Sequence, residues 1–290
     1  MQDTLAGKTI LITGATGGIG FIAARALAEM GATTVIVGRD RQRAEASVAQ
    51  IQRETGNASV SALVADLSSL ADVRQLAETF SSTYPRLDVL LNNAGALFLS
   101  RQTTVDGYER TFALNHLAPF LLTNLLLDRL KSDAPSRVVT VASMAHQGQR
   151  IDFADVNRSA RRYLAMNAYG ESKLANIMFT YALARRLEGA NVTANTLHPG
   201  FVATGFGKNN GAWSKVVMGL VSPFAISPEQ GAQTSIYLAS SPEVTAVSGQ
   251  YFIKRAPAKS SPASYDVAAQ ERLWTLSEQM TGLSASTRAV

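Results

Sequence analysis

The chain has 290 residues, of which 46% are hydrophobic and 17% are charged, so it can bury a substantial core and has an ordinary globular composition. It contains no cysteine, which excludes disulfide bonds and thiolate metal sites. Its three histidines, His116, His146 and His198, lie at no spacing typical of metal ligands. We therefore expect no metal site. We interpret these histidines as structural residues or as residues that contact and support the functional side chains.

The net charge of +5 is mild for this length and suits an anionic cofactor. A nucleic-acid-binding protein would concentrate its basic residues on one face or along one helix, whereas lysine and arginine are spread along this chain. The one local group, Arg158, Arg161 and Arg162, is interpreted as a solvated surface. No nucleic-acid partner is expected.

The first residues, MQDTLAGKTILITG, do not have the basic start and cleavable apolar run of a signal peptide. No stretch approaches the roughly 20 apolar residues that a membrane-spanning helix needs. The expected location is therefore the cytoplasm, with no membrane span. The sequence leaves a homo-oligomer open.

Short β-branched runs alternate with segments whose apolar residues recur at helical spacing. The expected strands are Thr9–Thr13, Thr34–Val37, Ser59–Val64, Val89–Asn92, Arg137–Val141 and Val192–Leu197. The expected helices include Gly18–Met30, Arg41–Glu54, Leu70–Ser82 and Ala118–Lys131. Because the strands are almost continuously apolar, we predict an α/β fold with both sheet faces covered. It is a doubly wound, Rossmann-type parallel sheet of about seven strands with helices on both faces, in a single domain over residues 1–290.

Two segments interrupt this alternation, residues 147–167 and residues 204–227. We expect both to fold over the carboxyl edge of the sheet and to select the substrate. The large apolar side chains of these two segments, together with Phe201 from the stretch between them, fit a local core equally well. They are Phe153, Tyr163, Met166, Phe201, Phe206, Trp213, Met218 and Phe224. A last amphipathic helix is expected over residues 265–280.

A glycine-rich turn, TGATGGIG at residues 13–20, follows the first expected strand and opens the first helix. Gly14, Gly18 and Gly20 allow a tight turn, close approach of a pyrophosphate, and close packing of the helix on the strand. The helix N-terminus then offers backbone N–H groups to the phosphates. A merely tight turn would need one glycine rather than four in seven residues, so the motif predicts dinucleotide binding.

The spacing Gly-x-x-x-Gly-x-Gly resembles that of the short-chain dehydrogenase/reductase family, and six further motifs follow in the family's order. They are Asp66-Leu67, Asn92-Asn93-Ala94-Gly95, Asn115, Ser143, Tyr169-Gly-Glu-Ser-Lys173 and Pro199-Gly200. Asp66-Leu67 is expected to close the third strand and Ser143 the fifth. The resemblance covers roughly residues 5–255.

Within that family the chain resembles the retinol-dehydrogenase-like branch, through the phrases NHLAPFLLT, VASMAH, AYGESKLANIMF and RLWTLSEQMTGL. Tyr169 follows Ser143 by 26 positions, which is longer than in most of the wider family but fits this branch. Many eukaryotic members of the branch begin with a membrane anchor, and no such segment is expected here. A retinoid substrate is therefore not implied.

The resemblance implies a role for each motif. The catalytic set would be Asn115, Ser143, Tyr169 and Lys173, with Asn115 holding a water that links Lys173 to solvent. The cofactor-binding set would be Gly14, Thr16, Gly17, Gly18, Ile19, Gly20, Arg39, Arg43, Asp66, Leu67, Asn93, Ala94, Gly95, Tyr169, Lys173, Pro199, Gly200, Val202 and Thr204.

Tyr169 and Lys173 lie four residues apart on an expected helix, so their side chains share one face. A phenol with its usual pKa of about 10 is a poor base at neutral pH. A neighbouring ammonium is expected to lower the pKa of Tyr169, which could then exchange a proton with a carbonyl or alcohol oxygen. Ser143 would hydrogen-bond the same oxygen, and Lys173 would also hold the nicotinamide ribose.

The end of the second strand, VIVGRD, predicts the cofactor. NAD enzymes place an acidic residue there to bind the ribose 2′-OH, whereas this chain has Gly38 followed by Arg39. A guanidinium can pair with a 2′-phosphate, and Arg43 could add a second contact. Asp40 is the competing ribose ligand, although the N-cap of the next helix explains it better. We expect NADP(H).

These patterns predict an NADP(H)-dependent oxidoreductase that moves a hydride between nicotinamide and a ketone, aldehyde or alcohol. The substrate is expected to be a small, apolar molecule. An NADP(H)-binding sensor or scaffold without turnover is the alternative from another class, and the complete Ser–Tyr–Lys–Asn set argues against it. A 3-oxoacyl thioester reductase is a third alternative, which the long spacing between Ser143 and Tyr169 weakens.

Overall fold

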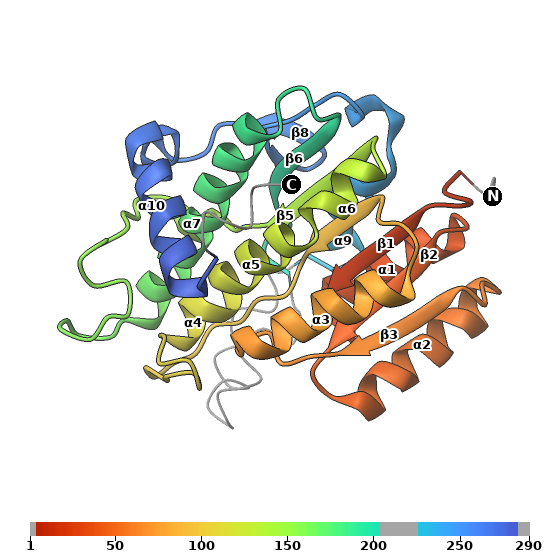
Figure 1. Ribbon diagram of the computed structural model, residues 1–290, viewed down its shortest axis with the longest axis horizontal. Helices are drawn as coiled ribbons and strands as arrows, with labels where there is room; N and C mark the ends of the chain where they lie inside the picture. The colour runs from red at the N-terminus through yellow and green to blue at the C-terminus, as the bar shows by residue number, and fades with distance from the viewer. Residues whose placement is uncertain (1–3, 203–225, 284–290) are drawn as a thin grey trace.

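The computed structural model describes residues 4–202 and 226–283. Within these residues one sheet has eight strands in the order β3-β2-β1-β4-β5-β6-β7-β8 (Figure 1). The strands are β1 (Thr9–Thr13), β2 (Thr33–Gly38), β3 (Val60–Val64), β4 (Val89–Asn92), β5 (Ser136–Val141), β6 (Val192–His198), β7 (Tyr251–Ile253) and β8 (Ala256–Ala258). All neighbouring pairs from β3 to β7 are parallel, and β8 runs antiparallel to β7.

Helices and short helical turns connect the strands. The helices are α1 (Gly18–Glu29), α2 (Arg41–Thr55), α3 (Leu70–Thr83), α4 (Arg110–Phe112), α5 (Ala118–Leu125), α6 (Leu127–Ser132), α7 (Ala165–Arg186), α9 (Pro228–Ser240) and α10 (Val267–Thr281). A π-helical turn, Ala113–Leu117, joins α4 to α5. The 3₁₀ turns are Met144–His146, Pro242–Val244 and Pro262–Tyr265.

Alternate residues of the central strands feed two apolar layers, one on each face of the sheet. Leu11 packs with Phe120 and Trp274 in the layer under α3, α5, α7 and α10. Ile10 and Ile12 pack in the opposite layer, with α1, α2 and α9. Figure 1 looks onto the side that carries α3 and α5, with α10 lying along α7. The sheet is therefore covered on both faces, as its continuously apolar strands predict.

The predicted fold class is confirmed, with local corrections. The sheet has eight strands rather than about seven, because the short β8 adds an antiparallel edge. The single helix predicted over Ala118–Lys131 is wrong: α5 ends at Leu125 and α6 starts at Leu127. The break falls at Leu126, whose backbone leaves the helical region with φ −97° and ψ 4°.

The C-terminal helix also differs from the prediction. It spans Val267–Thr281 rather than residues 265–280. Asp266 determines its start, because its carboxylate accepts a hydrogen bond from the Ala269 N–H at 3.0 Å. Tyr265 belongs to the preceding 3₁₀ turn.

A buried carboxylate joins the amino ends of β1 and β4. Asp88 is 3% exposed and accepts hydrogen bonds from the Thr9 N–H (2.8 Å), from Lys8 Nζ (2.9 Å) and from Arg86. Burial pushes the pKa of Asp88 upward, but the hydrogen bonds from Arg86, Thr9 and Lys8 together outweigh it, so this pKa is lowered. The ionised side chain therefore stabilises the fold.

The substitution Asp88→Asn is expected to lower the free energy of unfolding at pH 7 by about 2–3 kcal/mol, because it removes charged hydrogen bonds while keeping one acceptor. A lowered folded-state pKa means that this stabilisation is present above the unfolded pKa and is lost as the pH falls through the folded one. Urea unfolding at a series of pH values should show the difference from wild type shrinking in acid. Asp128→Asn, at an exposed carboxylate on α6, is the control. An equal effect of the two substitutions at pH 7 would contradict this role for Asp88.

Candidate active site

The carboxyl ends of β1 and β4 are in direct contact at the middle of the sheet. Gly14 has φ +66°, and a Cβ there would lie 2.8 Å from the Ala94 Cα. The Asn93 amide donates to the carbonyls of Thr13 (2.9 Å) and Gly14 (3.1 Å). Thr13 Oγ1 accepts from the N–H groups of Asn93 and Ala94, both at 3.0 Å. The glycine-rich turn and the Asn-Asn-Ala-Gly motif therefore form one structure.

The start of α1 packs tightly on this contact. A Cβ on Gly20 would lie 2.4 Å from the Asn93 amide nitrogen, so only glycine fits. Gly18 has φ +55°, in the left-handed region that favours glycine. Gly17, the N-cap of α1, is exposed. The helix N-terminus consequently presents its backbone N–H groups at the edge of the sheet.

Two predicted cofactor residues follow β2. Asp40 caps α2, since its carboxylate accepts from the Arg43 N–H at 2.8 Å, and its interpretation as an N-cap is confirmed. The Arg43 guanidinium extends back to the glycine-rich turn, where it is 3.8 Å from the Cβ position of Gly17. Gly38 is in contact with Thr16, whose methyl would lie 2.4 Å from a Cβ on Gly38. A side chain on residue 38 would therefore displace Thr16 of the glycine-rich turn.

Arg39 and Asp66 form the neighbouring part of this edge. The pKa of Asp66 is lowered: burial opposes the shift, while hydrogen bonds from Ser68 and the charges of Arg110 and Arg39 favour it. Asp66 and Leu67 do not close β3, which ends at Val64; Asp66 starts a turn by accepting from the Ser68 N–H at 2.9 Å. Leu67 is buried in the apolar layer.

The side chains of the predicted catalytic set converge on α7 and the end of β5. Tyr169 and Lys173 lie on one face of α7, and the Lys173 Nζ is 5.5 Å from the centre of the Tyr169 ring. Lys173 Nζ donates to the Val141 carbonyl at 3.0 Å. Ser143 does not close β5, which ends at Val141; it caps the following 3₁₀ turn, and its hydroxyl is hydrogen-bonded to Tyr169.

Asn115 lies in the π-helical turn, a rare conformation often found at functional sites. It is fully buried, and its amide exchanges two hydrogen bonds with the backbone of Ala96 (2.8 and 2.9 Å) while also donating to Ser172. A Cβ on Gly95 would lie 3.1 Å from Lys173 Nζ and 3.3 Å from Asn115 Oδ1. The structure therefore brings Asn115 and Lys173 together around Gly95.

Burial controls the proton affinities at this site. It raises the pKa of Tyr169 to about 12, against the opposing hydrogen bond from Ser143. It lowers the pKa of Lys173 to about 8. The expectation that the ammonium lowers the pKa of Tyr169 is therefore wrong for this structure, because removing the phenol from water has the larger effect.

The remaining predicted cofactor residues line the end of β6. Gly200 has φ +94°, and its Cβ position is 2.5 Å from the Ile226 side chain. Val202 and Ile19 meet above α9, since a Cβ on Gly231 would lie 2.5 Å from Val202 and 3.3 Å from Ile19. Pro199, directly before this bend, is partly exposed. Among the other candidates, Thr204, Phe206, Trp213, Met218 and Phe224 lie outside the described residues.

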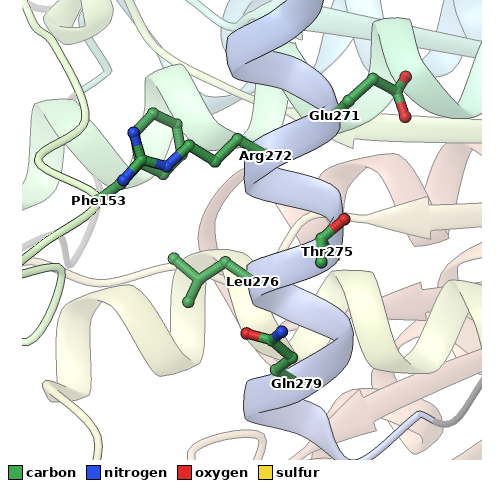
Figure 2. Close-up of a pocket in the computed structure, with 6 residues that line it drawn as sticks. All are labelled: Phe153, Glu271, Arg272, Thr275, Leu276 and Gln279. Atoms are coloured by element: carbon green, nitrogen blue, oxygen red, sulfur yellow. The ribbon is translucent and has the colours of Figure 1, made fainter.

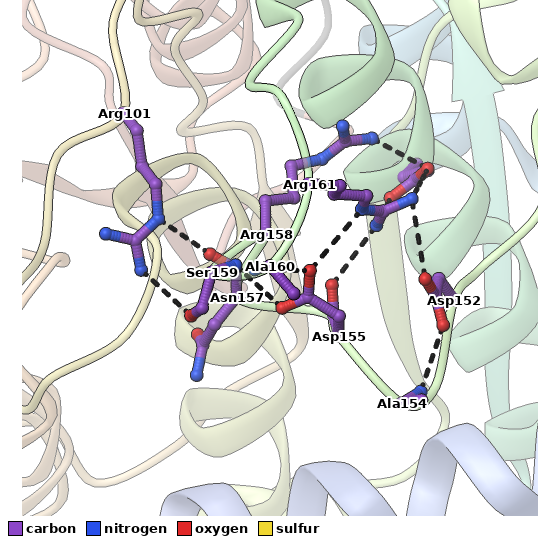
Figure 3. Close-up of polar contacts among 10 residues, drawn as sticks. Arg101, Asp152, Ala154, Asp155, Asn157, Arg158, Ser159, Ala160 and Arg161 are labelled. Carbon is purple, nitrogen blue, oxygen red and sulfur yellow. Dashed lines mark hydrogen bonds and ion pairs between the residues drawn. The ribbon is translucent and has the colours of Figure 1, made fainter.

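The segment predicted over residues 147–167 is a loop up to α7, and ion pairs hold it in place (Figure 3). Arg158, 3% exposed, pairs with Glu171 of α7 at 2.7 Å, and Arg161 pairs with the same carboxylate at 3.0 Å. Arg101, from the segment after β4, donates to the Asn157 carbonyl at 2.9 Å. The interpretation of this basic group as a solvated surface is wrong for Arg158, whereas Arg161 is partly exposed and Arg162 is exposed.

Glu171 is a residue that the sequence reasoning missed. It lies between Tyr169 and Lys173, so the loop is attached to the catalytic helix itself. Burial raises the pKa of Glu171, although the charges of Arg158 and Arg161 oppose this shift. The available signal was an acidic residue inside the Tyr-x-x-x-Lys motif that follows three nearby arginines.

Phe153 faces α10 instead of the predicted catalytic residues. Its ring lies under the Arg272 guanidinium at 4.6 Å, and it lines a hollow of about 490 Å³ together with residues of α10 (Figure 2). The α10 residues of this hollow are Glu271, Arg272, Thr275, Leu276 and Gln279. None of them belongs to the predicted site. Tyr163 is also tied into the fold, donating to the Phe98 carbonyl at 3.1 Å, whereas Met166 is 59% exposed.

In residues 4–202 and 226–283, no cluster of three histidine, cysteine or acidic side chains has the geometry of a metal site. None of the helices in this part of the chain is both long enough and apolar enough to span a membrane.

Known proteins share both the sequence and the fold of this chain. The family model described as short chain dehydrogenase matches residues 8–215. Human retinol dehydrogenase 14 is 46% identical over 293 residues, covering 96% of this chain and 87% of that protein. A crystal structure of an uncharacterized protein from Mycobacterium paratuberculosis has a TM-score of 0.78 and 36% identity, covering 96% of this chain and 94% of that one.

A second solved structure adds a liganded example. The RhlG/NADP active-site complex from Pseudomonas aeruginosa has a TM-score of 0.69 and 29% identity, and covers 86% of this chain and 95% of that one. The family match spans well over half of the chain, and the motifs it covers are those that meet at the carboxyl edge of the sheet. The chain therefore belongs to the short-chain dehydrogenase family of oxidoreductases, and within that family it is similar to the retinol dehydrogenases.

Proposed function

We propose that this protein is an NADP(H)-dependent oxidoreductase that interconverts an apolar carbonyl compound and its alcohol, with Tyr169 as the proton donor and acceptor. The observation that carries the proposal is the buried pair of Tyr169 and Lys173 beside Gly95, with the partly buried Ser143 hydrogen-bonded to Tyr169. A hydroxyl pair that shares a hydrogen bond, next to an ammonium, can hold and protonate one substrate oxygen.

The residues at the sheet edge fit a dinucleotide. Gly14 and Gly20 let the turn and the start of α1 pack on the end of β4. The exposed Gly17 leaves no side chain at the N-terminus of α1, where a pyrophosphate would bind. Gly95 leaves space beside Lys173, whose ammonium has three N–H donors and uses one on the Val141 carbonyl. The other donors suit ribose hydroxyls. When bound, the nicotinamide supplies the hydride in reduction and accepts it in oxidation.

The side chains supply the proton chemistry. With a pKa of about 12, Tyr169 is protonated at neutral pH and can donate to the substrate oxygen as the carbonyl carbon accepts a hydride. The developing phenolate would be stabilised by Lys173, whose pKa of about 8 leaves it mostly charged at pH 7. Ser143 would orient the same oxygen.

Three features support NADP(H) over NAD(H). Gly38 takes the position where an acidic side chain would repel a 2′-phosphate, and Asp40 is occupied as the N-cap of α2. Arg39 follows directly, and Arg43 reaches the glycine-rich turn. The RhlG structure, which is similar in fold, is described as a complex with NADP. A guanidinium is well suited to a phosphate because it can form two parallel hydrogen bonds.

Exposed apolar side chains next to the catalytic motifs support an apolar substrate. Met144 follows Ser143, and Leu164 and Met166 precede Tyr169; all three are more than two-fifths exposed. Apolar surface gathered at one place on a protein commonly marks a binding site.

Tyr169→Phe tests the chemistry. It removes the proton donor and keeps the ring, so NADPH should still bind while kcat falls by about 10²–10⁴-fold. Cofactor binding is measured by NADPH fluorescence and turnover by NADPH absorbance with an active carbonyl substrate. Retention of more than about a tenth of the wild-type kcat would refute the role of Tyr169.

Arg39→Ala tests the cofactor. A hydrogen bond to a charged group contributes roughly 1.5–3 kcal/mol, so the KM for NADPH should rise by about ten- to a hundredfold. The KM for NADH should change far less, apart from lost stacking on the shared adenine. Arg41→Ala is the control, because Arg41 pairs with Glu45 on α2 and its side chain is 76% exposed. An equal rise in the KM for both cofactors, or a wild-type preference for NADH, would instead indicate that Asp40 binds the ribose.

Met166→Ala tests the substrate site. Because Met166 is exposed beside Tyr169, its truncation should change the ranking of carbonyl substrates by kcat/KM and leave the KM for NADPH unaltered. Phe153→Ala is the matched control on the same segment: it should lower Tm, since Phe153 packs against α10, without reordering the substrates. If Phe153→Ala reordered the substrates and Met166→Ala did not, the substrate would bind on the α10 side of the loop.

A further inference from the structure

A short turn carries Ser143 and packs against the catalytic helix. Ser143 caps the 3₁₀ turn Met144–His146, with the Ala145 N–H donating to Ser143 Oγ at 3.2 Å. A Cβ on Gly170 would lie 2.4 Å from the Ala145 carbonyl, so the turn is in direct contact with α7 one residue after Tyr169. The position of this turn therefore sets the relation between the hydroxyls of Ser143 and Tyr169.

His146 connects this turn to a distant part of the chain. Its ring is fully buried, with Nδ1 at 2.6 Å from the Ser143 carbonyl oxygen and Nε2 at 3.0 Å from the backbone nitrogen of Ser261. A backbone N–H can only donate, so Nε2 is the acceptor and the ring proton is on Nδ1, donating to Ser143. Burial lowers the pKa of His146, which favours this neutral form.

Residues 260–261, where the Ser261 N–H binds His146, are also attached to α7, the helix that carries Tyr169. Ser260 shares a hydrogen bond of 2.8 Å with the Tyr181 hydroxyl of α7. A closed path thus runs from Ser143 through His146 to residues 260–261, and returns through Tyr181 to the helix that carries Tyr169. A second imidazole holds the turn from β6, because His198 Nδ1 accepts from the Met144 N–H at 3.3 Å.

We propose that His146 is a positioning residue that holds Ser143 against Tyr169 by bridging the Ser143 carbonyl to the backbone of Ser261. It does not touch the substrate and acts only through Ser143. The inference rests on the proposed function of Ser143 and Tyr169. Displacing a reacting group by about 1 Å can cost on the order of a hundredfold in rate, so loss of this bridge has a measurable effect on kcat.

The test is a double-mutant cycle of Ser143→Ala and His146→Phe, measured as kcat for NADPH-dependent reduction of an active carbonyl substrate. Phenylalanine keeps a ring against Tyr251, which His146 contacts edge-on at 5.2 Å between centroids, and removes both hydrogen bonds. We expect His146→Phe alone to lower kcat by about ten- to a hundredfold with unchanged NADPH affinity. In the Ser143→Ala background it should cause no further loss.

Controls separate positioning from general destabilisation. Ser136→Ala removes a buried hydrogen bond to the Leu130 carbonyl (2.7 Å) at the opposite end of β5, and should lower Tm without lowering kcat. If His146→Phe does not fold, the cycle is run with His146→Gln, which can still accept from Ser261 but loses the bond to Ser143.

The outcomes are distinct. A multiplicative loss in the double variant, or a kcat for His146→Phe equal to that of Ser136→Ala, would overturn the positioning role of His146. Full activity of Ser143→Ala would instead overturn the proposed function, and the role of His146 with it.

Discussion

The contact between the glycine-rich turn and the end of β4 is the constraint on which the site depends. A side chain on Gly14 would overlap the Ala94 backbone, and Asn93 fastens the two segments through the carbonyls of Thr13 and Gly14. Because β1 and β4 are neighbours at the point where the strand order reverses, this contact fixes the crevice in which doubly wound proteins bind nucleotides. Gly95 comes directly after this contact in the chain, and Asn115 and Lys173 lie around Gly95.

The buried catalytic helix is the second determinant. The stretch Ala168–Leu183 of α7 is buried along its whole length, so Tyr169 and Lys173 are withdrawn from water together. This burial raises the pKa of Tyr169 and lowers the pKa of Lys173. The phenol therefore has the higher pKa of the two, which is the reverse of the order in water. The same helix holds the 147–164 loop through ion pairs of Arg158 and Arg161 with Glu171, which lies between Tyr169 and Lys173.

Local patterns predicted strands β1 to β6 and helices α1 to α3 close to their observed bounds. The apolar strands, the glycine turn and the cap at Asp40 each depend on residues close together in the chain, and sequence periodicity reports such relations directly. Side-chain fates that depend on distant partners were missed. Phe153 faces α10, where the Arg272 guanidinium covers its ring.

Burial is the other property that the sequence conceals. Arg158 looks like a surface arginine, and only the folded chain places it beside Glu171 with 3% of its side chain exposed. The pKa of Tyr169 was mispredicted for the same reason, since the neighbouring charge was visible in the sequence and the degree of burial was not.

The most direct measurement is the rate at which the purified protein oxidises NADPH with a panel of apolar ketones and aldehydes, followed at the NADPH absorbance. We expect turnover with several members of the panel, formation of the matching alcohol in equal amount, and a higher kcat/KM with NADPH than with NADH. Saturable NADPH binding without turnover on any ketone, aldehyde or alcohol would contradict an oxidoreductase and would indicate a protein that binds the cofactor without catalysis.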